Sequence, residues 1–111
     1  MRLRHAAPLL VVGWILMVPP DSTVPHSVDT AAPMSRWRRI VEFNNANDCQ
    51  TAVTTLNKRN PDIPVPLDPT GELRRFQRRQ PADPQLALAR VGNATCIASD
   101  DPRLTKGEAQ P

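Results

Sequence analysis

Two cysteines, Cys49 and Cys96, lie 47 positions apart in a chain of 111 residues, and the sequence contains no other cysteine. An even cysteine count in a short chain with an export-like N-terminus is typical of a disulfide, because that bond persists only in oxidising compartments. Closing a loop of about 48 residues would stabilise a fold by about 4 kcal/mol in the chain-entropy model. The sequence therefore predicts a Cys49–Cys96 disulfide, and two unpaired, buried thiols in a cytosolic protein are the alternative.

The composition allows only a small core, which makes a covalent link more valuable. The chain has 13 prolines but only two Trp, two Phe and no Tyr. A chain of this length forms one domain at most, and small cores often need a staple. One compact domain is therefore expected over residues 14–104, with a disordered tail over 105–111.

The N-terminus resembles an export signal. Arg2 and Arg4 precede the apolar run L-L-V-V-G-W-I-L-M-V, which extends from Leu9 to Val18. Ten residues of helix rise about 15 Å, half of the hydrocarbon core of a bilayer, so no transmembrane span is predicted. Residues 1–13 are predicted to be a signal peptide cleaved after Gly13. The alternatives are a start codon placed too far downstream, an uncleaved segment on the membrane surface, and a cytosolic protein with an apolar first strand.

The pattern of the remaining chain predicts an α+β fold. Trp37, Arg39, Val41 and Phe43 alternate with Arg38, Ile40 and Glu42, and the first set is apolar except for Arg39, as in a half-buried strand. Asn45 is a good helix N-cap, Asp48 is placed to complete a capping box, and apolar residues then recur at helical spacing. The expected elements are strands at Trp14–Val18, Arg38–Phe43 and Ala94–Ser99, a main helix at Ala46–Lys58, and a helix at Gln85–Val91 capped by Asp83.

These elements predict a small antiparallel sheet of two or three strands packed on one main helix. The disulfide would join the helix face of Cys49 to the strand face of Cys96. Residues 59–84 read as a proline-rich insertion with a short helix near Glu72–Gln80. We expect the segment from Pro61 to Pro84 to be dispensable for folding, and Phe76→Ala to cost less than about 1.5 kcal/mol. A mostly disordered chain with one stable helix is the alternative.

Four sequence blocks resemble a family of small, uncharacterised exported bacterial proteins. They are W-I-L-M-V-P-P from Trp14, A-P-M-S-R-W from Ala32, F-N-N-A-N-D-C from Phe43 and C-I-A-S-D-D-P-R-L from Cys96. The family shows W-x-L-M-x-P-P, A-P-L-S-x-W, S-F-D-[ST]-A-x-x-C and C-[IV]-A-S-D-D-P-R-L in this order. The resemblance implies that the mature chain begins at Trp14, and it implies no activity. Here Asn44-Asn45 replaces the family's Asp-Ser, which keeps the capping chemistry.

Two arginine clusters are candidates for binding an anion, although each has a structural interpretation. Arg74, Arg75, Arg78 and Arg79 surround Phe76, which could stack on a base, but a solvated helix face with one buried ring is the preferred interpretation. Arg36, Arg38 and Arg39 flank Trp37, which is expected to pack under their stems. If Arg2 and Arg4 are excluded, the chain has 12 of its 14 basic side chains and 11 acidic ones, which is close to neutral. No nucleic-acid partner is therefore expected.

No constellation of residues predicts catalysis or metal binding. Asp100 and Asp101 lack the surrounding oxygen-rich loop that hard cations require, and they are interpreted as the end of a strand, with Arg103 as a local ion-pair partner. His26 is expected in a loop without a metal or triad partner. The protein is predicted to be a non-enzymatic exported protein, periplasmic or extracellular, that needs no cofactor and acts by surface contact, with another envelope protein as the partner considered. A cytosolic, nucleic-acid-associated protein using its arginines is the alternative.

Overall fold

The computed structural model describes residues 12–58 and 62–106, with side chains described up to Leu104. Most of the predicted signal peptide and of the predicted tail therefore lies outside the described residues. The elements follow in the order β1 (Trp14–Val18), η2 (Met34–Arg36), β2 (Arg38–Phe43), α1 (Ala46–Asn57), η3 (Val65–Leu67), α2 (Glu72–Arg78), α3 (Pro84–Gly92), β3 (Thr95–Ala98) and α4 (Arg103–Lys106), where η marks a 3-10 helix.

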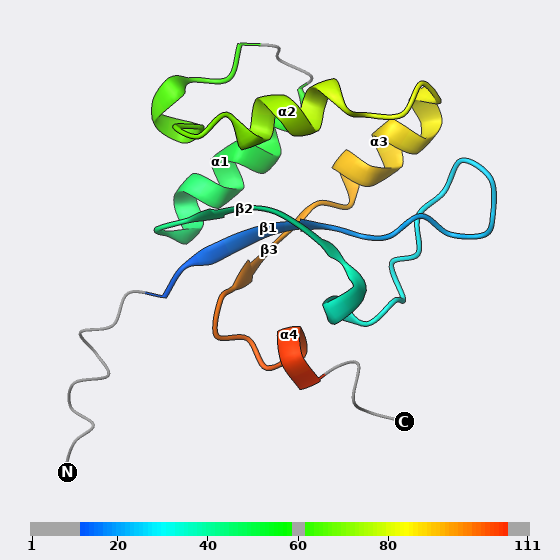
Figure 1. Cartoon of the computed structure of the whole chain (residues 1–111), viewed down its shortest axis with the longest axis horizontal. Coiled ribbons are helices and arrows are strands. Elements are labelled where there is room, and N and C mark those ends of the chain that lie inside the picture. Colours follow the sequence, from blue (N-terminus) through cyan, green and yellow to red (C-terminus); the bar gives the residue numbers. More distant parts are fainter. Residues whose placement is uncertain (1–11, 59–61, 107–111) are drawn as a thin grey trace.

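The sheet is antiparallel with strand order β2-β1-β3, which confirms the predicted α+β class (Figure 1). The central strand β1 is covered on both faces, so its sequence W-I-L-M-V is an almost continuous apolar run. Cross-strand partners share a face of the sheet. Leu16 pairs with Val41 and Cys96 on the face that the helices cover, and Ile15 pairs with Glu42 and Ile97 on the other.

A β-bulge in β2 changes which residues share a face. Val41 pairs with Leu16 and Arg39 pairs with Met17, so Ile40 is the extra residue between them. Ile40 is buried in the same core as Phe43, whereas Arg39 lies opposite Met17 on the other face. The prediction that Arg39, Val41 and Phe43 share one face is therefore wrong, because alternation does not continue through a bulge.

Helices α1, α2 and α3 cover one face of the sheet and form the larger core with it (Figure 1). Cys49, Ala52 and Leu56 form the buried face of α1, as the sequence pattern predicts. The amide of Asp48 donates to Asn45 Oδ1 at 2.8 Å, which confirms the N-cap. The Asp48 carboxylate, however, accepts from the Asn45 side-chain amide at 3.2 Å, a pairing that differs from the predicted capping box.

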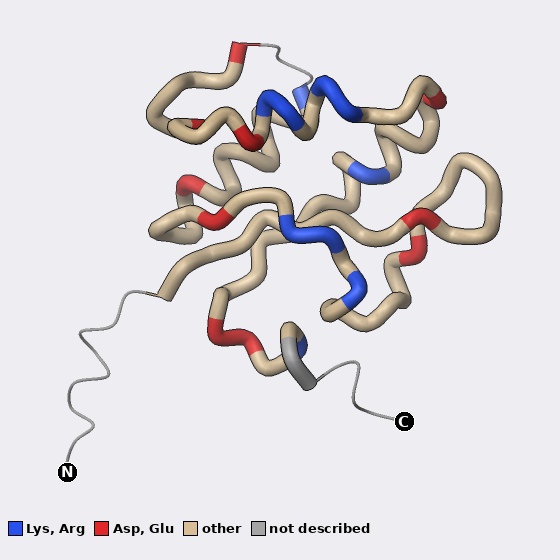
Figure 2. Tube along the Cα trace, viewed as in Figure 1, with Lys and Arg blue, Asp and Glu red and all other residues tan. Residues whose placement is uncertain are grey.

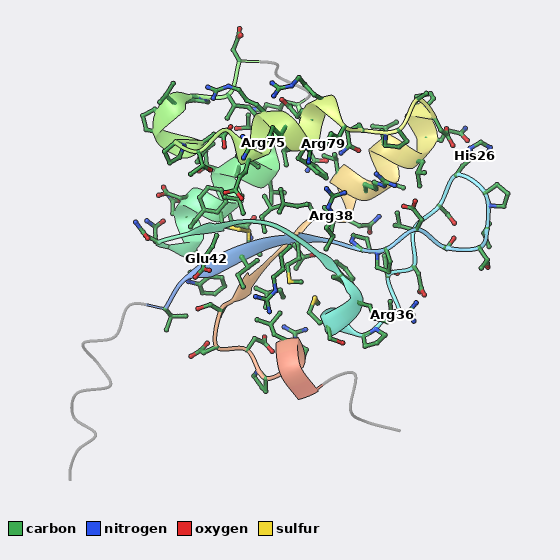
Figure 3. The ribbon with its side chains drawn as sticks, in the orientation of Figure 1. His26, Arg36, Arg38, Glu42, Arg75 and Arg79 are labelled. Carbon is green, nitrogen blue, oxygen red and sulfur yellow. A yellow bond between two sulfur atoms is a disulfide. The ribbon has the colours of Figure 1, made fainter. Side chains whose placement is uncertain are left out.

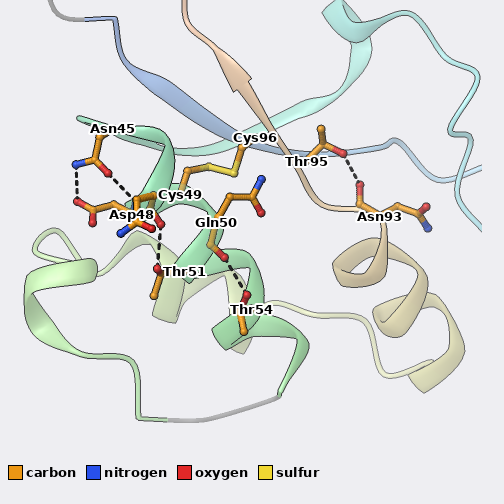
Figure 4. The surroundings of a disulfide bond; sticks show 10 residues. Asn45, Asp48, Cys49, Gln50, Thr51, Thr54, Asn93, Thr95 and Cys96 are labelled. Carbon is orange, nitrogen blue, oxygen red and sulfur yellow. Dashed lines mark hydrogen bonds between the residues drawn. A yellow bond between two sulfur atoms is a disulfide. The ribbon is translucent and has the colours of Figure 1, made fainter.

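The disulfide joins α1 to β3 at the centre of this core (Figure 4). The Cα atoms of Cys49 and Cys96 are 6.1 Å apart, within the usual range for a disulfide. Cys49 is fully buried, and neither cysteine is free. The prediction of a helix-to-strand disulfide is confirmed, and the alternative of unpaired thiols is not supported.

The proline-rich segment contributes side chains to the larger core, which argues against the prediction that it is dispensable for folding. Leu73 and Phe76 of α2 are 0% and 4% exposed, and Ile63 is 3% exposed. Asp68 is buried too, and two hydrogen bonds compensate its carboxylate for the loss of water. The carboxylate accepts from the amides of Leu73 and Arg74 at 3.0 and 3.1 Å. It thereby caps α2 from three residues before Gly71, which has a left-handed backbone. Local composition shows the prolines but not these distant contacts.

A smaller core lies on the opposite face of the sheet. Ile15, Met17 and Ile97 pack there against Leu104, with Met34 and Trp37 beside them. Leu104 belongs to α4, a short helix that was not predicted from the sequence. The turn at Asp101 is the only local sequence signal that precedes it. The Asp101 carboxylate caps this helix by accepting from the Arg103 amide at 2.8 Å.

The edges of the domain are consistent with a compact fold. Gly13 extends β1, because its amide donates to Ser99 Oγ at 3.0 Å and its carbonyl accepts from the Ser99 amide at 2.8 Å.

Among residues 12–58 and 62–106, no helix has the length and apolarity that crossing a bilayer requires.

Candidate functional site

The fold brings the two arginine clusters of the sequence together in one groove. Figure 2 shows the basic residues of α2 above those at the start of β2, and Figure 3 places Arg38 below Arg75 and Arg79. The groove has a volume of about 290 Å³. We call it the arginine groove; its lining comprises Arg38, Arg39, Ile40, Glu72, Arg75, Phe76 and Arg79.

Most of the positive charge in the arginine groove is uncompensated. None of the ion pairs among the described residues includes Arg38, Arg39 or Arg79. Arg75 donates from Nη1 to the Thr70 carbonyl at 3.1 Å, which holds its side chain without neutralising it. Glu72 is the one acidic residue among the described residues of the lining. Arg39 pairs with Met17 on the opposite face of the sheet, so the guanidinium groups on the side of α2 are those of Arg38, Arg75 and Arg79. Three guanidinium groups therefore lie beside a single carboxylate, an arrangement that attracts anions.

The floor of the groove is apolar and closed. Ile40 is 9% exposed and Phe76 is 4% exposed, and both belong to the larger core. The sequence-based idea that Phe76 could stack on a base therefore fails, because a buried ring has no free face. The interpretation of this cluster as a helix face with one buried ring is confirmed.

A second cavity lies on the other flank of α2. It has a volume of about 630 Å³ and lies among α1, α2 and α3; we call it the apolar pocket. Its apolar lining includes Leu56, Pro81, Ala82, Ala87, Leu88 and Val91, and its charged lining is Arg74 and Arg78. The Arg74 guanidinium is already engaged, with Nη2 donating to the Ile63 carbonyl at 2.7 Å and Nη1 lying 3.6 Å from the Asp68 carboxylate. Arg78 is exposed and takes part in none of the ion pairs of the described chain.

The loop between β1 and η2 is fastened to α3 and its N-cap by two side-chain contacts. Arg90 donates from Nη2 to Asp21 Oδ2 at 2.7 Å and from Nε to Oδ1 at 3.0 Å. His26 Nδ1 contacts the Asp83 carboxylate, and that hydrogen bond lowers the pKa of Asp83 below its ordinary value. His26 thus has a carboxylate partner 57 positions away, which the sequence did not reveal. Asp83 is also the N-cap of α3, as predicted, and it accepts from the Gln85 amide at 3.0 Å.

The remaining candidates play local roles. Asp101 pairs with Arg103 at 2.7 Å, as the sequence suggested, and hydrogen bonds from Arg103 lower the Asp101 pKa. Within the part of the chain that the structure describes, no group of three or more His, Cys, Asp and Glu side chains is arranged to hold a metal ion. Trp37 packs against the smaller core, and its indole Nε1 donates to the Ala32 carbonyl at 3.0 Å.

Sequence reasoning missed three features around α2. It considered the two arginine clusters separately, since nothing local shows that a strand and a helix 37 positions apart are neighbours. It also missed the apolar pocket and the buried Asp68. The only available signal was the spacing D-P-T-G-E, in which an acidic residue precedes a glycine at a helix start.

Comparisons of this chain with protein-family models, with curated proteins and with solved structures find no match. The resemblance of its four sequence blocks to small exported bacterial proteins therefore stays a prediction.

Proposed function

We propose that this protein is a non-enzymatic exported protein that acts by surface contact, and that its arginine groove binds an acidic segment of another exported protein. The observation that carries the proposal is the convergence of Arg38, Arg75 and Arg79, with Glu72 as the one described acidic residue among them. The disulfide supports the oxidising compartment, because such bonds are rare where thiols are kept reduced.

Carboxylates suit this groove for reasons of geometry. A guanidinium group presents a planar fork of donors that can bind both oxygens of a carboxylate, and it keeps its charge at any physiological pH. Arg38 comes from the strand β2, whereas Arg75 of α2 and Arg79, the C-cap of that helix, lie one helical turn apart. Three guanidinium forks on two sides of a groove match an extended chain with several acidic side chains.

A nucleic-acid partner is the weaker candidate. The chain after residue 13 is close to neutral, with 12 basic side chains if Arg2 and Arg4 are excluded and 11 acidic ones. A polyphosphate backbone is bound most tightly by a wide basic surface, and single strands by exposed aromatic platforms as well. Phe76 offers no such platform, since it is buried.

A binding measurement tests the groove directly. Fluorescence anisotropy of a labelled ten-residue polyglutamate peptide would be followed as the oxidised protein is added at low and at moderate salt. Arg38→Gln combined with Arg79→Gln should weaken binding about tenfold, because each charge-assisted contact contributes about 1 kcal/mol or less at an exposed site.

Two matched controls locate the effect. Arg36→Gln removes a charge from η2, away from the groove (Figure 3), and Arg78→Gln removes the neighbour of Arg79 on the other flank of α2. Both should bind the peptide nearly as the parent does. Equal losses of peptide affinity in all variants would mean that binding depends on net charge and not on the groove. Tighter binding of a ten-base oligothymidylate than of the peptide would favour the nucleic-acid alternative.

Export is tested separately. Cell fractionation with mass spectrometry of the intact protein distinguishes a chain that starts at Trp14 from one that starts at Met1. A periplasmic or secreted chain starting at Trp14, with Cys49 and Cys96 resistant to alkylation until reduction, is the expected result. A reduced cytosolic chain starting at Met1 would contradict this part of the proposal.

A further inference from the structure

The apolar pocket is separate from the arginine groove, and its lining has its own chemistry. Its volume of about 630 Å³ falls within the range of small-molecule sites, which are mostly apolar with a few placed polar groups. Leu56 comes from the end of α1, Pro81 and Ala82 from the connection between α2 and α3, and Ala87 and Val91 from α3. Two helices and one connection therefore supply apolar walls, and covering them with an apolar ligand would be favourable.

The surface around the pocket is unusually apolar for an exposed place. Leu88 lines the pocket and is 51% exposed, which makes it one of the few large apolar side chains of the described chain left in water. An exposed Leu by itself is ordinary, but an exposed Leu at the edge of an apolar cavity adds to the area that a ligand can cover. The ligand should therefore carry a continuous apolar body.

The charge of the lining indicates the other end of the ligand. Arg74 and Arg78 are the charged residues that residues 12–58 and 62–106 contribute to the pocket, and none of its described lining residues is acidic. Arg74 is held by Asp68 and Ile63, which leaves Arg78 as the described cation available to a ligand. A flexible, exposed guanidinium beside apolar walls complements a molecule with an apolar chain and one terminal anion.

From this combination we infer that the apolar pocket binds a single-chain carboxylate amphiphile, that is, a fatty acid. Its hydrocarbon chain lies against Leu56, Ala87 and Val91, and its carboxylate pairs with Arg78. The inference goes beyond the proposed function, because it concerns the opposite flank of α2 and uses none of the arginines of the groove.

The test is a titration of the oxidised, isotopically labelled protein with dodecanoate below its micelle concentration, followed by amide and methyl NMR shifts. The expected result is saturable binding with the largest shifts at Leu56, Ala87, Leu88 and Val91. Dodecan-1-ol, which has the same chain without the charge, should bind about fivefold more weakly. Acetate, which has the charge without the chain, should produce no shifts in the pocket.

Variants then assign the two ends of the ligand. Arg78→Gln should weaken dodecanoate binding about fivefold and leave dodecan-1-ol unaffected, whereas Arg79→Gln, on the groove side, should change neither. Ala87→Phe should fill the cavity and weaken both ligands at least about tenfold. Ala82→Phe, in the connection, provides the same obstruction if the helix variant fails to fold, and Gln85→Phe places a ring on the exposed side of α3 as a control.

Several outcomes would overturn the inference. They are a lack of saturable dodecanoate binding, unchanged binding in both Ala87→Phe and Ala82→Phe, and equal binding of the acid and the alcohol. Shifts of Ala87 and Leu88 on adding the acidic peptide would assign the pocket to that partner instead. A failure here leaves the peptide measurement on the groove unaffected, so the two proposals can be distinguished.

Discussion

The two faces of β1 are covered by structures of very different kinds. On the helix side, α1, α2 and α3 enclose Leu16 and Val18, and the Cys49–Cys96 bond ties the layers together. On the other side, Ile15 and Met17 are covered by the short elements η2 and α4, which contact each other. Both cores join segments far apart in the chain, but the smaller core is covered only by short elements that depend on turns and caps. The helix-side core should therefore unfold cooperatively, as one unit, whereas the smaller core should open locally while the rest of the domain stays folded.

The largest expected effect tests the share of α2 in the helix-side core. Phe76→Ala should lower the free energy of unfolding by about 3–5 kcal/mol, because a buried ring is removed and a cavity remains. Urea denaturation of the oxidised protein measures it. Val65→Ala, at a side chain 64% exposed in the same proline-rich segment, should change stability by less than about 0.5 kcal/mol. A Phe76→Ala cost under about 1.5 kcal/mol would restore the idea of a dispensable segment.

Removing the disulfide is expected to have the second-largest effect on stability. Replacing both cysteines, Cys49→Ala with Cys96→Ala, should lower the free energy of unfolding by about 2–4 kcal/mol, because the unfolded chain regains the freedom that the closed loop removed. Unfolding of the parent with and without reductant provides the comparison that changes no residue. A variant as stable as the oxidised parent would mean that packing of α1 alone holds the helix layer.

A smaller effect is expected on the other face. Leu104→Ala should cost about 1–2 kcal/mol, below the usual range for a buried leucine, because α4 can detach without opening the rest of the domain. Hydrogen exchange should show faster opening at Trp37 and Leu104 and little change in α1. Equal acceleration at Cys49 would contradict the view that the two cores fail separately.

The smallest expected effect concerns the cap of α4 and its dependence on pH. Hydrogen bonds from Arg103 lower the pKa of Asp101 below its ordinary value of 3.8. A carboxyl whose pKa is lower in the folded state stabilises that state above the unfolded pKa, and this contribution is lost as the pH falls through the folded pKa. Asp101→Asn should therefore increase amide exchange at Arg103 and Leu104 at pH 7, with a difference that shrinks toward pH 3. If the difference in exchange between the variant and the parent does not change with pH, the charge of Asp101 is not what stabilises α4.

The sequence predicted most elements because their signals are local. The strands at Trp14–Val18 and Arg38–Phe43 have the predicted bounds, and α1 begins directly after the predicted cap at Asn45. The Cys49–Cys96 pairing was also accessible, since a chain with two cysteines allows only one intramolecular bond.

What could not be predicted depends on contacts between distant segments. The bulge at Ile40 is decided by pairing with β1, and the burial of Leu73 and Phe76 depends on where α2 docks. The arginine groove has the same origin, because β2 and α2 each looked like a solvated basic surface until they were neighbours. Local patterns thus revealed the elements and the bond between them, but neither of the two cavities beside α2.

The position of β1 has a consequence for how this chain must be made. Of the three strands, the first in chain order lies in the middle of the sheet, and its second partner, β3, begins only at Thr95. Until β3 has been synthesised, β1 has one open edge and an apolar surface on both faces, a state prone to pairing with other chains. The sheet therefore remains incomplete, and its central strand remains open to wrong partners, until the chain has been made as far as Ala98.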